Sequence, residues 1–462
     1  MAGIVLTADI GTSSLKAAFI DLDGKLLTFS RRVYRPDISG GIGADAWERA
    51  FADTLESLHS QAPSCVIDGI CISGNGPTLV PVTAEGEALS PLYWHDGRKV
   101  QPPVSSPPAS SSFFLPHAAW LKRNAFPLYE RTKLFLSSHE WLASRLGAEP
   151  VTVLPSEAYE PYYWDEQQCY LFDLDRSKFP PFIKMGEIAG HVSKGASSFF
   201  GSRLKSGTPI IAGGPDFITA LIGTGTGKPG DVCDRAGSSE GINVCVAEAV
   251  YGESLRLLPH AVGGLWNAGI VINSSGRHFD RYRKHAGMEE TSYEDLLAHL
   301  IPFSDNTALF DLDFFFHPDA PDFDPSRTPE KADLGRAVLC AIGFSVRSAL
   351  ETLAGLGLPV SVMRVSGGQG KNPRWNQLKA DISGASLMIP EISDGELAGN
   401  AVLAALALEG RKSTAIESTA NRMIRFREIY KPQSGVAAFW ENRYGLYRKD
   451  SVKCKITNVK QG

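Results

Sequence analysis

The sequence predicts an α/β protein with a largely buried sheet, and two observations carry this prediction. Apolar strands alternate with helical segments along the 462 residues, which is the pattern of a sheet covered by helices. Glycine-rich turns follow three of the apolar strands, within residues 9–16, 230–250 and 365–382. Open α/β sheets bind their ligands where strands end, so these turns are the first places to look for chemistry.

The composition is that of an ordinary globular protein and limits the partners that we expect. The chain is 43% hydrophobic and 21% charged with a net charge of −5, and neither sign forms a long run. A bulk nucleic-acid partner would require a basic stripe, so none is predicted. No apolar run approaches the ~18 residues that cross a bilayer, and no targeting signal opens the sequence. We therefore expect a soluble cytoplasmic protein without a membrane partner.

Cysteine usage favours a reducing compartment. The cysteines are odd in number, scattered and without a C-x-x-C pair, so they predict neither a disulfide framework nor a zinc site. They are Cys65, Cys71, Cys169, Cys233, Cys245, Cys340 and Cys454.

The N-terminal residues predict strand, turn, strand, turn, strand, then a helix and a further strand. "IVLTADI", "LKAAFIDL" and "LLTFS" are the first three strands, with a turn at 23–25 between the last two. The segment 43–61 spaces apolar side chains at helical intervals. "VIDGICISG" at 66–74 is then a buried strand that ends in glycine.

Further along, the Pro/Ser-rich segment 100–112 predicts a surface loop and His117–Leu146 predicts helix. A second strand–turn–strand unit occupies 230–250, and a third glycine turn within 365–382 joins a strand to a helix. No repeat of 20–50 residues is visible, which argues against a solenoid. We expect a domain boundary near residue 246.

The first turn carries more polar groups than a hairpin needs. Its donors and its acid are Asp9, Gly11, Thr12, Ser13, Ser14 and Lys16. Glycine allows close backbone approach to a nucleotide phosphate, and N–H and hydroxyl groups can then surround it. The turn "AGSSEG" at 236–241 offers the same chemistry. Each turn alone is equally compatible with a plain hairpin.

Two familiar motifs are excluded by their context. "GTGTGK" at 223–228 is one residue too short for a phosphate-binding P-loop, and Pro229 stands where that loop needs Ser or Thr. "GSSEG" at 237–241 matches a nucleophile elbow, which requires a helix directly afterwards. The following "INVCV" predicts a strand, so Ser239 is not expected to be a hydrolase nucleophile.

Asp216 is the most informative acid in the chain. A strand from Pro209 to Ala212 runs into Gly213-Gly214-Pro215, and Asp216 then opens an apolar helix. Asp is a good helix N-cap, and a carboxylate at the end of a sheet strand is also well placed for ligand chemistry. Position alone leaves both roles open.

Taken together, these segments resemble the FGGY family of carbohydrate kinases. "DIGTSSLK" is similar to the family's first phosphate turn, "GGPDFITALIGTG" to its catalytic-aspartate segment and "AGSSEGIN" to its second phosphate turn. "SGGQGKNPRWNQLKADISGASLMIPE" resembles the adenosine segment and "GELAGNAVLAAL" the helix after it. The resemblance extends from about residue 4 to about residue 448.

The resemblance implies a two-domain actin/hexokinase-like (ribonuclease H-like) fold with a central cleft. It divides the chain into an N-terminal domain at 1–245 that carries the sugar and phosphate side, a C-terminal adenosine domain at 246–448 and a tail at 449–462. It also implies ATP and Mg²⁺ as cofactors. A homodimer is left open.

The resemblance also implies residue roles. Asp216 would be the catalytic base, and Asp9 would face Mg²⁺ through water. The cofactor-binding residues would be Thr12, Ser13, Ser14, Lys16, Gly237, Ser238, Gly276, Gly368 and Asn372. Lys16 lies on the strand after the turn, where it could point at phosphate or away.

On the sugar side, "LYWHDGR" resembles the family's W-x-D-x-R segment, so the expected substrate contacts are Asn75, Trp94, Asp96, Arg98 and Asp216. Core packing of Trp94 and simple pairing of Arg98 with Asp96 are the structural alternatives. Xylulose kinases usually carry Met-His-Gly where this chain has Asn75-Gly76-Pro77. We therefore expect a kinase for a small ketose or polyol, first a pentulose of the xylulose type. The alternatives are ribulose, fuculose, gluconate or glycerol kinases, or a non-catalytic sensor.

Overall fold

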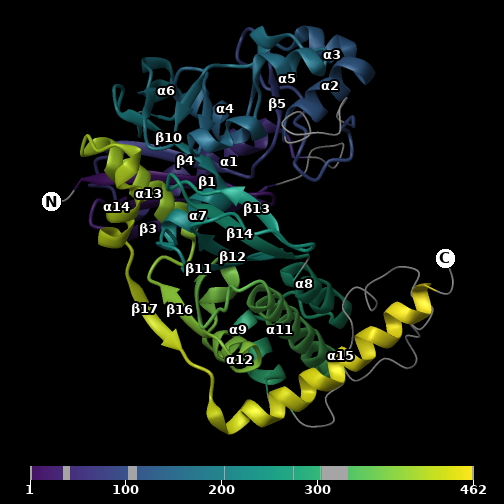
Figure 1. The fold of residues 1–462 in the computed structure, drawn as a ribbon. Helices are drawn as coiled ribbons and strands as arrows, with labels where there is room; N and C mark the ends of the chain where they lie inside the picture. The colour runs from purple at the N-terminus through teal and green to yellow at the C-terminus, as the bar shows by residue number, and fades with distance from the viewer. Residues whose placement is uncertain are drawn as a thin grey trace. The chain divides into compact units, whose positions relative to one another are not determined.

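A computed structural model describes residues 3–34, 42–101, 112–201, 203–273, 275–301, 303 and 331–459. The chain forms two compact units (Figure 1). Unit 1 comprises Met1–Gly227, Leu258–Trp266 and Asp394–Arg425, and unit 2 comprises Lys228–Leu257, Asn267–Ser393 and Phe426–Gly462. These units are not sequential halves divided near residue 246, because the chain returns to unit 1 twice after leaving it.

Unit 1 is built on a six-stranded sheet in the order β3-β2-β1-β4-β10-β9. The strands are β1 (Ile4–Ile10), β2 (Ser14–Asp21), β3 (Leu26–Val33), β4 (Gly69–Gly74), β9 (Ile188–His191) and β10 (Pro209–Pro215). β4 runs parallel to β1 on one side and to β10 on the other. The carboxyl ends of these three central strands therefore meet at one edge, with Asp9 and Gly214 both in register with Ser73.

The helices of unit 1 follow the apolar patterns of the sequence in most places. They are α1 (Ala44–Gln61), α2 (Leu115–Asn124), α3 (Phe126–Arg131), α4 (Ser138–Leu146), α5 (Glu166–Leu171), α6 (Lys194–Phe199), α7 (Asp216–Gly223), α13 (Gly395–Leu408) and α14 (Ile416–Met423). Short strand pairs accompany them: β5 (Val80–Val82) with β6 (Leu134–Leu136), and β7 (Thr152–Leu154) with β8 (Phe182–Lys184).

Helix α13 is the last large element of unit 1, yet it packs on strands from the start of the chain. It contacts β1, β4 and α7, and it lies beside α7 in Figure 1. The contact with α7 is so close that a Cβ on Gly223 would lie 1.9 Å from the carbonyl oxygen of Gly395. Only glycine allows this approach, which explains why "GELAGNAVLAAL" is rich in small residues.

Unit 2 is built on a seven-stranded sheet in the order β13-β14-β12-β11-β15-β16-β17. The strands are β11 (Val232–Ala236), β12 (Glu240–Val246), β13 (Arg256–Pro259), β14 (Trp266–Ile272), β15 (Val362–Ser366), β16 (Ser386–Pro390) and β17 (Phe426–Tyr430). The described helices are α8 (Ser275–Ala286), α9 (Tyr293–Leu300), α11 (Lys331–Gly355), α12 (Pro373–Ser383) and α15 (Ala437–Val459).

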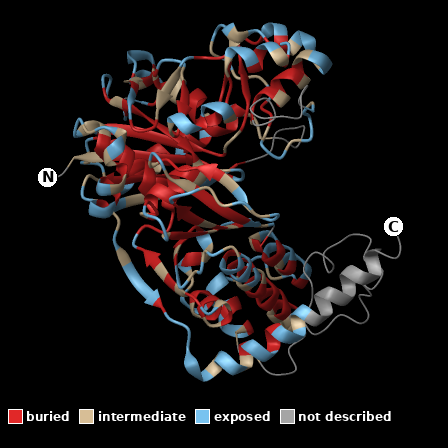
Figure 2. Ribbon diagram, in the orientation of Figure 1, coloured by how far each residue is buried: buried red, intermediate tan, exposed pale blue. Residues whose placement is uncertain are grey.

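Helix α11 forms the centre of the hydrophobic core of unit 2. It packs with α8, α9 and α12, and most of its length is drawn as buried in Figure 2. By length and composition alone its segment Ala332–Gly355 would pass for a membrane span, which corrects our expectation that no apolar run approaches that length. Since 67% of the apolar stretch of this segment is buried inside the structure, α11 is a core helix.

Most of the predicted elements are confirmed, including the strand after "GSSEG", which is β12 and excludes a nucleophile elbow at Ser239. The expectation of helix throughout His117–Leu146 is wrong, because β6 interrupts it to pair with β5. Of the expected surface loop at 100–112, residues 102–111 lie outside the described residues.

Candidate active site

The first glycine turn joins β1 to β2 and exposes two of its three hydroxyl residues. Its chain reverses through a hydrogen bond of 3.0 Å from Gly11 N to the Ser14 carbonyl. Thr12 and Ser13 are exposed, whereas Ser14 is buried and its hydroxyl accepts a hydrogen bond of 2.9 Å from Arg31 Nε. Thr12 and Ser13 are therefore the two hydroxyl residues of this turn that a ligand can reach directly.

Asp9 is buried at the end of β1 and is held by side chains from distant parts of unit 1. Its Oδ1 accepts a hydrogen bond of 2.8 Å from Ser73 on β4. The Ser73 hydroxyl in turn accepts one of 2.9 Å from Asn400 Nδ2 on α13. Burial raises the pKa of Asp9, the negative charge of Glu396 adds to this, and Lys16 opposes it. Asp216 also raises the pKa of Asp9, so the two carboxylates share one electrostatic environment.

Lys16 points to the start of α13. Its Nζ lies 3.0 Å from Asp394 Oδ1 and 3.9 Å from Glu396 Oε2. Burial would lower the pKa of Lys16, but the surrounding carboxylates Glu396, Asp394 and Asp9 outweigh it and keep the ammonium charged. One lysine thus faces several carboxylates, and the excess negative charge suits a cation.

Asp216 is the first residue of α7, directly after β10. The N-cap position belongs to Pro215, so of the two roles that the sequence left open for Asp216 the structure does not support that of N-cap. Asp216 Oδ1 accepts a hydrogen bond of 2.7 Å from Phe217 N. The residue is half-buried and follows β10, whose end lies at the same sheet edge as Asp9.

The expected sugar-side residues lie in different environments. Asn75 follows β4, is 1% exposed, and its Oδ1 accepts a hydrogen bond of 3.1 Å from Ser138 Oγ. Trp94 is 48% exposed, which excludes the alternative of core packing. Arg98 binds Asp96 through its Nε at 2.9 Å, so their pairing is confirmed, and the guanidinium lowers the pKa of Asp96.

In unit 2 the second glycine turn lies between β11 and β12, with Gly237 and Ser238 exposed. Gly276, near the start of α8, packs against it so closely that a Cβ there would lie 2.3 Å from the Gly237 carbonyl oxygen. Gly368 is exposed with open space around it. Asn372 caps α12, because its Oδ1 accepts a hydrogen bond of 3.1 Å from Trp375 N.

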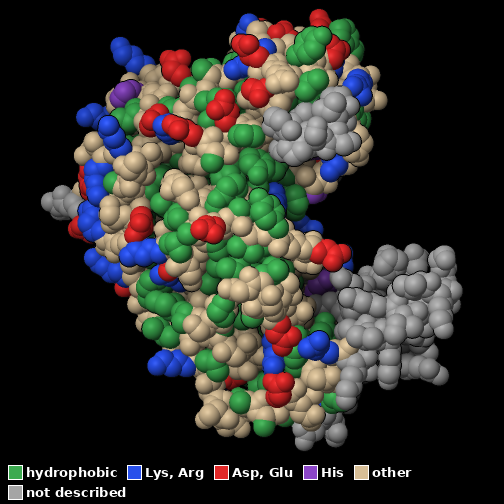
Figure 3. All heavy atoms as spheres, viewed as in Figure 1, with side chains coloured by type: hydrophobic (Ala, Val, Ile, Leu, Met, Phe, Trp, Pro, Cys, Tyr) green, Lys and Arg blue, Asp and Glu red, His purple; other side chains and the backbone are tan. Residues whose placement is uncertain are grey.

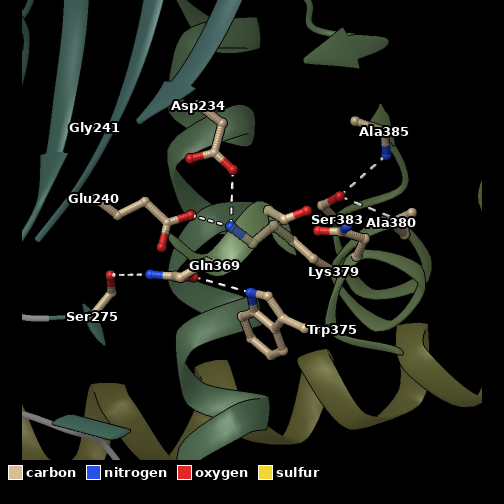
Figure 4. Close-up of polar contacts among 12 residues, drawn as sticks. Asp234, Glu240, Gly241, Ser275, Gln369, Trp375, Lys379, Ala380, Ser383 and Ala385 are labelled. Atoms are coloured by element: carbon tan, nitrogen blue, oxygen red, sulfur yellow. Dashed lines mark hydrogen bonds and ion pairs between the residues drawn. The ribbon is translucent and has the colours of Figure 1, made fainter. Parts of the chain in front are cut away.

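A buried ion cluster fixes the strands on both sides of this turn (Figure 4). Lys379 Nζ on α12 lies 2.9 Å from Asp234 Oδ2 on β11 and 2.5 Å from Glu240 Oε1 on β12. All three side chains are 1% exposed or less. Burial and the neighbouring Glu240 raise the pKa of Asp234. A proton held on Asp234 leaves one carboxylate charge opposite the one ammonium charge of Lys379.

The sequence interpretation did not include several residues that support these turns. They are Ser73, Asp394, Glu396 and Asn400 in unit 1, and Asp234, Glu240, Gln369 and Lys379 in unit 2. Of the expected residues, the structure places Asp9, Lys16 and Asp216 at the same end of the unit 1 sheet, and it packs Gly276 against Gly237 in unit 2.

The two α/β units, in which glycine turns follow strands of the sheets, have the fold of the actin/hexokinase-like class. Two family models match this chain: the N-terminal domain of the FGGY family of carbohydrate kinases at 105–223 and its C-terminal domain at 293–408. The chain belongs to the FGGY family of carbohydrate kinases. It is accordingly a phosphotransferase with an alcohol group as acceptor, and family members use ATP as the phosphate donor.

Named relatives act on different small molecules. A xylulose kinase of Staphylococcus epidermidis is 24% identical, covering 96% of this chain and 95% of its own. An autoinducer-2 kinase of Escherichia coli is 24% identical, with 93% and 90% covered.

Solved structures share the fold. A xylulose kinase from Brucella ovis has a TM-score of 0.77 at 19% identity, with 98% of this chain and 100% of the other covered. A gluconate kinase from Lactobacillus acidophilus has a TM-score of 0.77 at 18% identity, with 99% and 98% covered.

Proposed function

We propose that this kinase transfers the γ-phosphate of ATP to a hydroxyl of a small ketose or polyol, and that a pentulose of the xylulose type is its first candidate substrate. The observation that carries this proposal is that Asp9, near the end of β1, and Asp216, directly after β10, lie at one edge of the unit 1 sheet. Phosphoryl transfer needs positioning and charge neutralisation more than covalent catalysis, and a pair of carboxylates can divide these tasks.

Asp216 is the proposed general base. Its carboxylate is half-buried at the start of α7, and one of its oxygens is oriented by Phe217 N. From this position it would accept the proton of the attacking sugar hydroxyl. A general base of this kind contributes roughly 10²–10⁴ in rate.

Asp9 is proposed to hold Mg²⁺ through water. Mg²⁺ takes oxygen ligands, keeps several waters and is usually bound through one or two carboxylates together with substrate phosphates. The Asp9 carboxylate, oriented by the Ser73 hydroxyl, supplies oxygen of the kind that this mode uses. When bound, Mg²⁺ would neutralise charge on the β- and γ-phosphate oxygens.

The glycine turns are proposed to bind the nucleotide. Thr12, Ser13 and Ser14 would surround the β- and γ-phosphates from unit 1, with the exposed pair, Thr12 and Ser13, closest to them. Gly237 and Ser238 would support the transferred phosphate, with Gly276 packed behind them. Gly368 and Asn372 would flank the adenosine. A phosphate contact from Lys16 stays a prediction, since its ammonium already faces Asp394.

The sugar would contact Asn75, Trp94 and the Asp96–Arg98 pair. The exposure of Trp94 supports a role at a surface rather than in the core. A loop with Asn75-Gly76-Pro77 offers no imidazole donor, and sites built around a hydrogen bond discriminate strongly. D-xylulose should therefore be a mediocre substrate. Ribulose, fuculose, gluconate and glycerol are the other candidates.

The partners we propose are small molecules, in a cytoplasmic protein. Acidic and basic side chains are interspersed on the face shown in Figure 3, and the net charge is −5. This charge pattern supports the absence of a bulk nucleic-acid or membrane partner. A homodimer is the oligomeric state that we propose for the protein in solution.

A coupled assay of ADP release over a panel of ketoses and polyols tests this function. We expect at least one sugar to give turnover well above the ATPase background, and D-xylulose to fall below the best substrate. D-xylulose leading the panel by a wide margin would contradict our interpretation of Asn75-Gly76-Pro77. No sugar-dependent ADP release across the panel would contradict the proposed substrate class.

A further inference from the structure

Gln369 connects three segments of unit 2 through its side-chain amide, and Figure 4 shows two of these contacts, with Ser275 and with Trp375. It lies in the short helical turn Gly368–Lys371 after β15. Its Nε2 donates to the Gly237 carbonyl at 3.1 Å and to Ser275 Oγ at 3.2 Å, and its Oε1 accepts from Trp375 Nε1 at 3.0 Å. Both N–H groups of the amide and its oxygen are thus engaged in hydrogen bonds.

Every carbonyl of the exposed turn 237–239 is committed to the fold. The Gly237 oxygen accepts from Gln369, the Ser238 oxygen accepts from Arg277 N at 3.1 Å, and the Ser239 oxygen accepts from Gly237 N at 3.0 Å. The backbone N–H groups of Ser238 and Ser239 have no partner among the residues that the structure describes. The turn therefore offers two backbone donors, while each of its carbonyls already accepts a hydrogen bond from the protein.

The planar trans peptide links the direction of the Gly237 carbonyl to the direction of the Ser238 N–H. In such a peptide the carbonyl oxygen and the following N–H point in opposite directions. A carbonyl of Gly237 held toward Gln369 consequently directs the Ser238 N–H away from Gln369. Neighbouring backbone N–H groups that point outward from a turn form an anion-binding concavity.

The backbone behind the turn leaves it little freedom to move. A Cβ on Gly276 would lie 2.3 Å from the Gly237 oxygen, and one on Gly367 would lie 2.5 Å from the Ala236 oxygen. Lys379 holds the strands on both sides through Asp234 and Glu240. Within this frame, the Gln369 amide is the group that donates a hydrogen bond to the carbonyl of the 237–238 peptide.

We propose that Gln369 is a positioning residue, which fixes the peptide between Gly237 and Ser238 so that the Ser238 N–H faces the terminal phosphates of ATP. This inference rests on the proposed function, in which the turn receives those phosphates. Preorganised backbone donors of this kind stabilise charge as it develops on a transferred group. Gln369 would thereby couple the adenosine segment to the phosphate turn without touching the nucleotide phosphates itself.

The test compares nucleotides that differ only in their phosphates. Gln369→Met keeps the length and neutrality of the side chain but removes both N–H donors. We expect the calorimetric affinity for AMP to stay within about twofold of wild type. Affinity for the non-hydrolysable analogue AMP-PNP should fall about tenfold or more, and kcat should fall by up to the ~10²-fold that a misplacement of 1 Å costs.

Two further variants separate the hydrogen bonds from other effects. Gln377→Met is the matched control, because Gln377 lies on α12 and its amide binds Asp381 and the Lys431 carbonyl. It should leave both nucleotide affinities unchanged. Gln369→Leu also removes both N–H donors and adds no charge, so it should show the same selective loss even if the methionine variant folds poorly.

The outcomes are distinguishable. A similar fall in the affinities for AMP and AMP-PNP in the Gln369 variants would reduce Gln369 to a structural contact and overturn the inference. Unchanged affinities and kcat would overturn it as well. Wild-type protein that binds AMP and AMP-PNP equally would instead contradict the proposed phosphate turn. A loss of affinity for AMP-PNP without a loss for AMP supports both the positioning role of Gln369 and the proposed phosphate turn.

Discussion

The side-chain amide of Asn400 donates a hydrogen bond of 2.9 Å to the hydroxyl of Ser73, although 327 residues separate the two in the chain. Asn400 Nδ2 also donates to the Ala8 carbonyl at 2.9 Å. Because Ser73 accepts from Asn400, its single proton is free to go to Asp9 Oδ1 at 2.8 Å. α13 therefore orients a carboxylate on β1 through a hydroxyl on β4.

This relationship predicts coupled effects of Ser73 and Asn400 on turnover. Ser73→Ala removes the hydrogen bond to Asp9, and Asn400→Leu removes the donor that orients the Ser73 hydroxyl. Each change should lower kcat. If Asn400 acts through Ser73, the double variant should be no worse in kcat than Ser73→Ala alone, which steady-state kinetics on the three variants can measure.

The stability cost of these two variants should differ. Asn400→Leu leaves the buried Ala8 carbonyl without this donor, which should lower the free energy of unfolding in denaturant by about 1–3 kcal/mol.

Fully additive losses of kcat in the double variant would show that the two residues act independently, and would contradict the coupling.

A second prediction concerns the buried cluster around Lys379. Lys379→Met leaves Asp234 and Glu240 facing each other without a cation, at positions with 1% exposure or less. Removing one partner of a buried ion pair costs about 3–5 kcal/mol. Urea denaturation followed by circular dichroism should show a loss of this size.

The matched control replaces the whole cluster. Lys379→Met combined with Asp234→Asn and Glu240→Gln removes the uncompensated charge, so we expect it to recover most of the stability that Lys379→Met loses. A triple variant less stable than Lys379→Met would indicate that the acids are stabilising by themselves.

The parts of the site that depend on adjacent residues could be predicted from the sequence. The parts that depend on contacts between distant residues could not. The turn at 9–16, the strand before Asp216 and the glycine turn before β12 could be recognised because each depends on adjacent residues. Asn400 and Gln369 carry no local signal, since their partners Ser73 and Gly237 are far away in the sequence. These pairings follow from which strands become neighbours in the sheets.

Burial could not be predicted for Lys379 or Trp94: the lysine is buried and the tryptophan is exposed, each against the tendency of its residue type. A lysine is almost never fully buried unless it is paired. From the sequence alone, Lys379 would therefore be predicted to lie on the surface of its helix. It is 1% exposed because β11 and β12 supply two acids. Trp94 could be a core residue by type, yet it is 48% exposed.

A third prediction concerns acid stability and His139. This imidazole lies on α4 with 4% exposure, and neither ring nitrogen has a hydrogen-bond partner among the described residues. Burial lowers the pKa of His139 to about 3, with the Glu140 carboxyl 3.9 Å from its Nε2. The unfolded chain takes up this proton near pH 6.5, so between pH 6.5 and about 3 it binds a proton that the folded chain refuses.

The contribution of His139 to stability should therefore fall as the pH drops through this window, by up to about 1.4 kcal/mol per pH unit. His139→Leu removes this contribution, so the variant should gain stability relative to wild type as the pH is lowered from 7 to 5. Denaturant midpoints at several pH values measure the difference. His191→Leu, at an exposed position on β9, controls for the exchange of one imidazole. An unchanged pH slope in His139→Leu would contradict the prediction.

The last prediction concerns Asp216 as the base. Asp216 occupies the first position of α7, and its Oδ1 accepts from Phe217 N. Asparagine retains an acceptor oxygen for this hydrogen bond, so Asp216→Asn should fold with a melting temperature close to wild type. A neutral amide cannot take the hydroxyl proton, and kcat on the best sugar should fall by at least ~10² with much smaller changes in sugar and nucleotide affinity.

Asp216→Ala separates the two roles further. It should lose the same activity and also the hydrogen bond to Phe217 N, at a cost of about 1 kcal/mol in unfolding free energy. Equal stability of the alanine and asparagine variants would show that the bond to Phe217 N contributes nothing measurable. A folded Asp216→Asn variant with near wild-type kcat would remove Asp216 from the chemistry. Asp9, the other carboxylate in the same electrostatic environment, would then be the first candidate for the base.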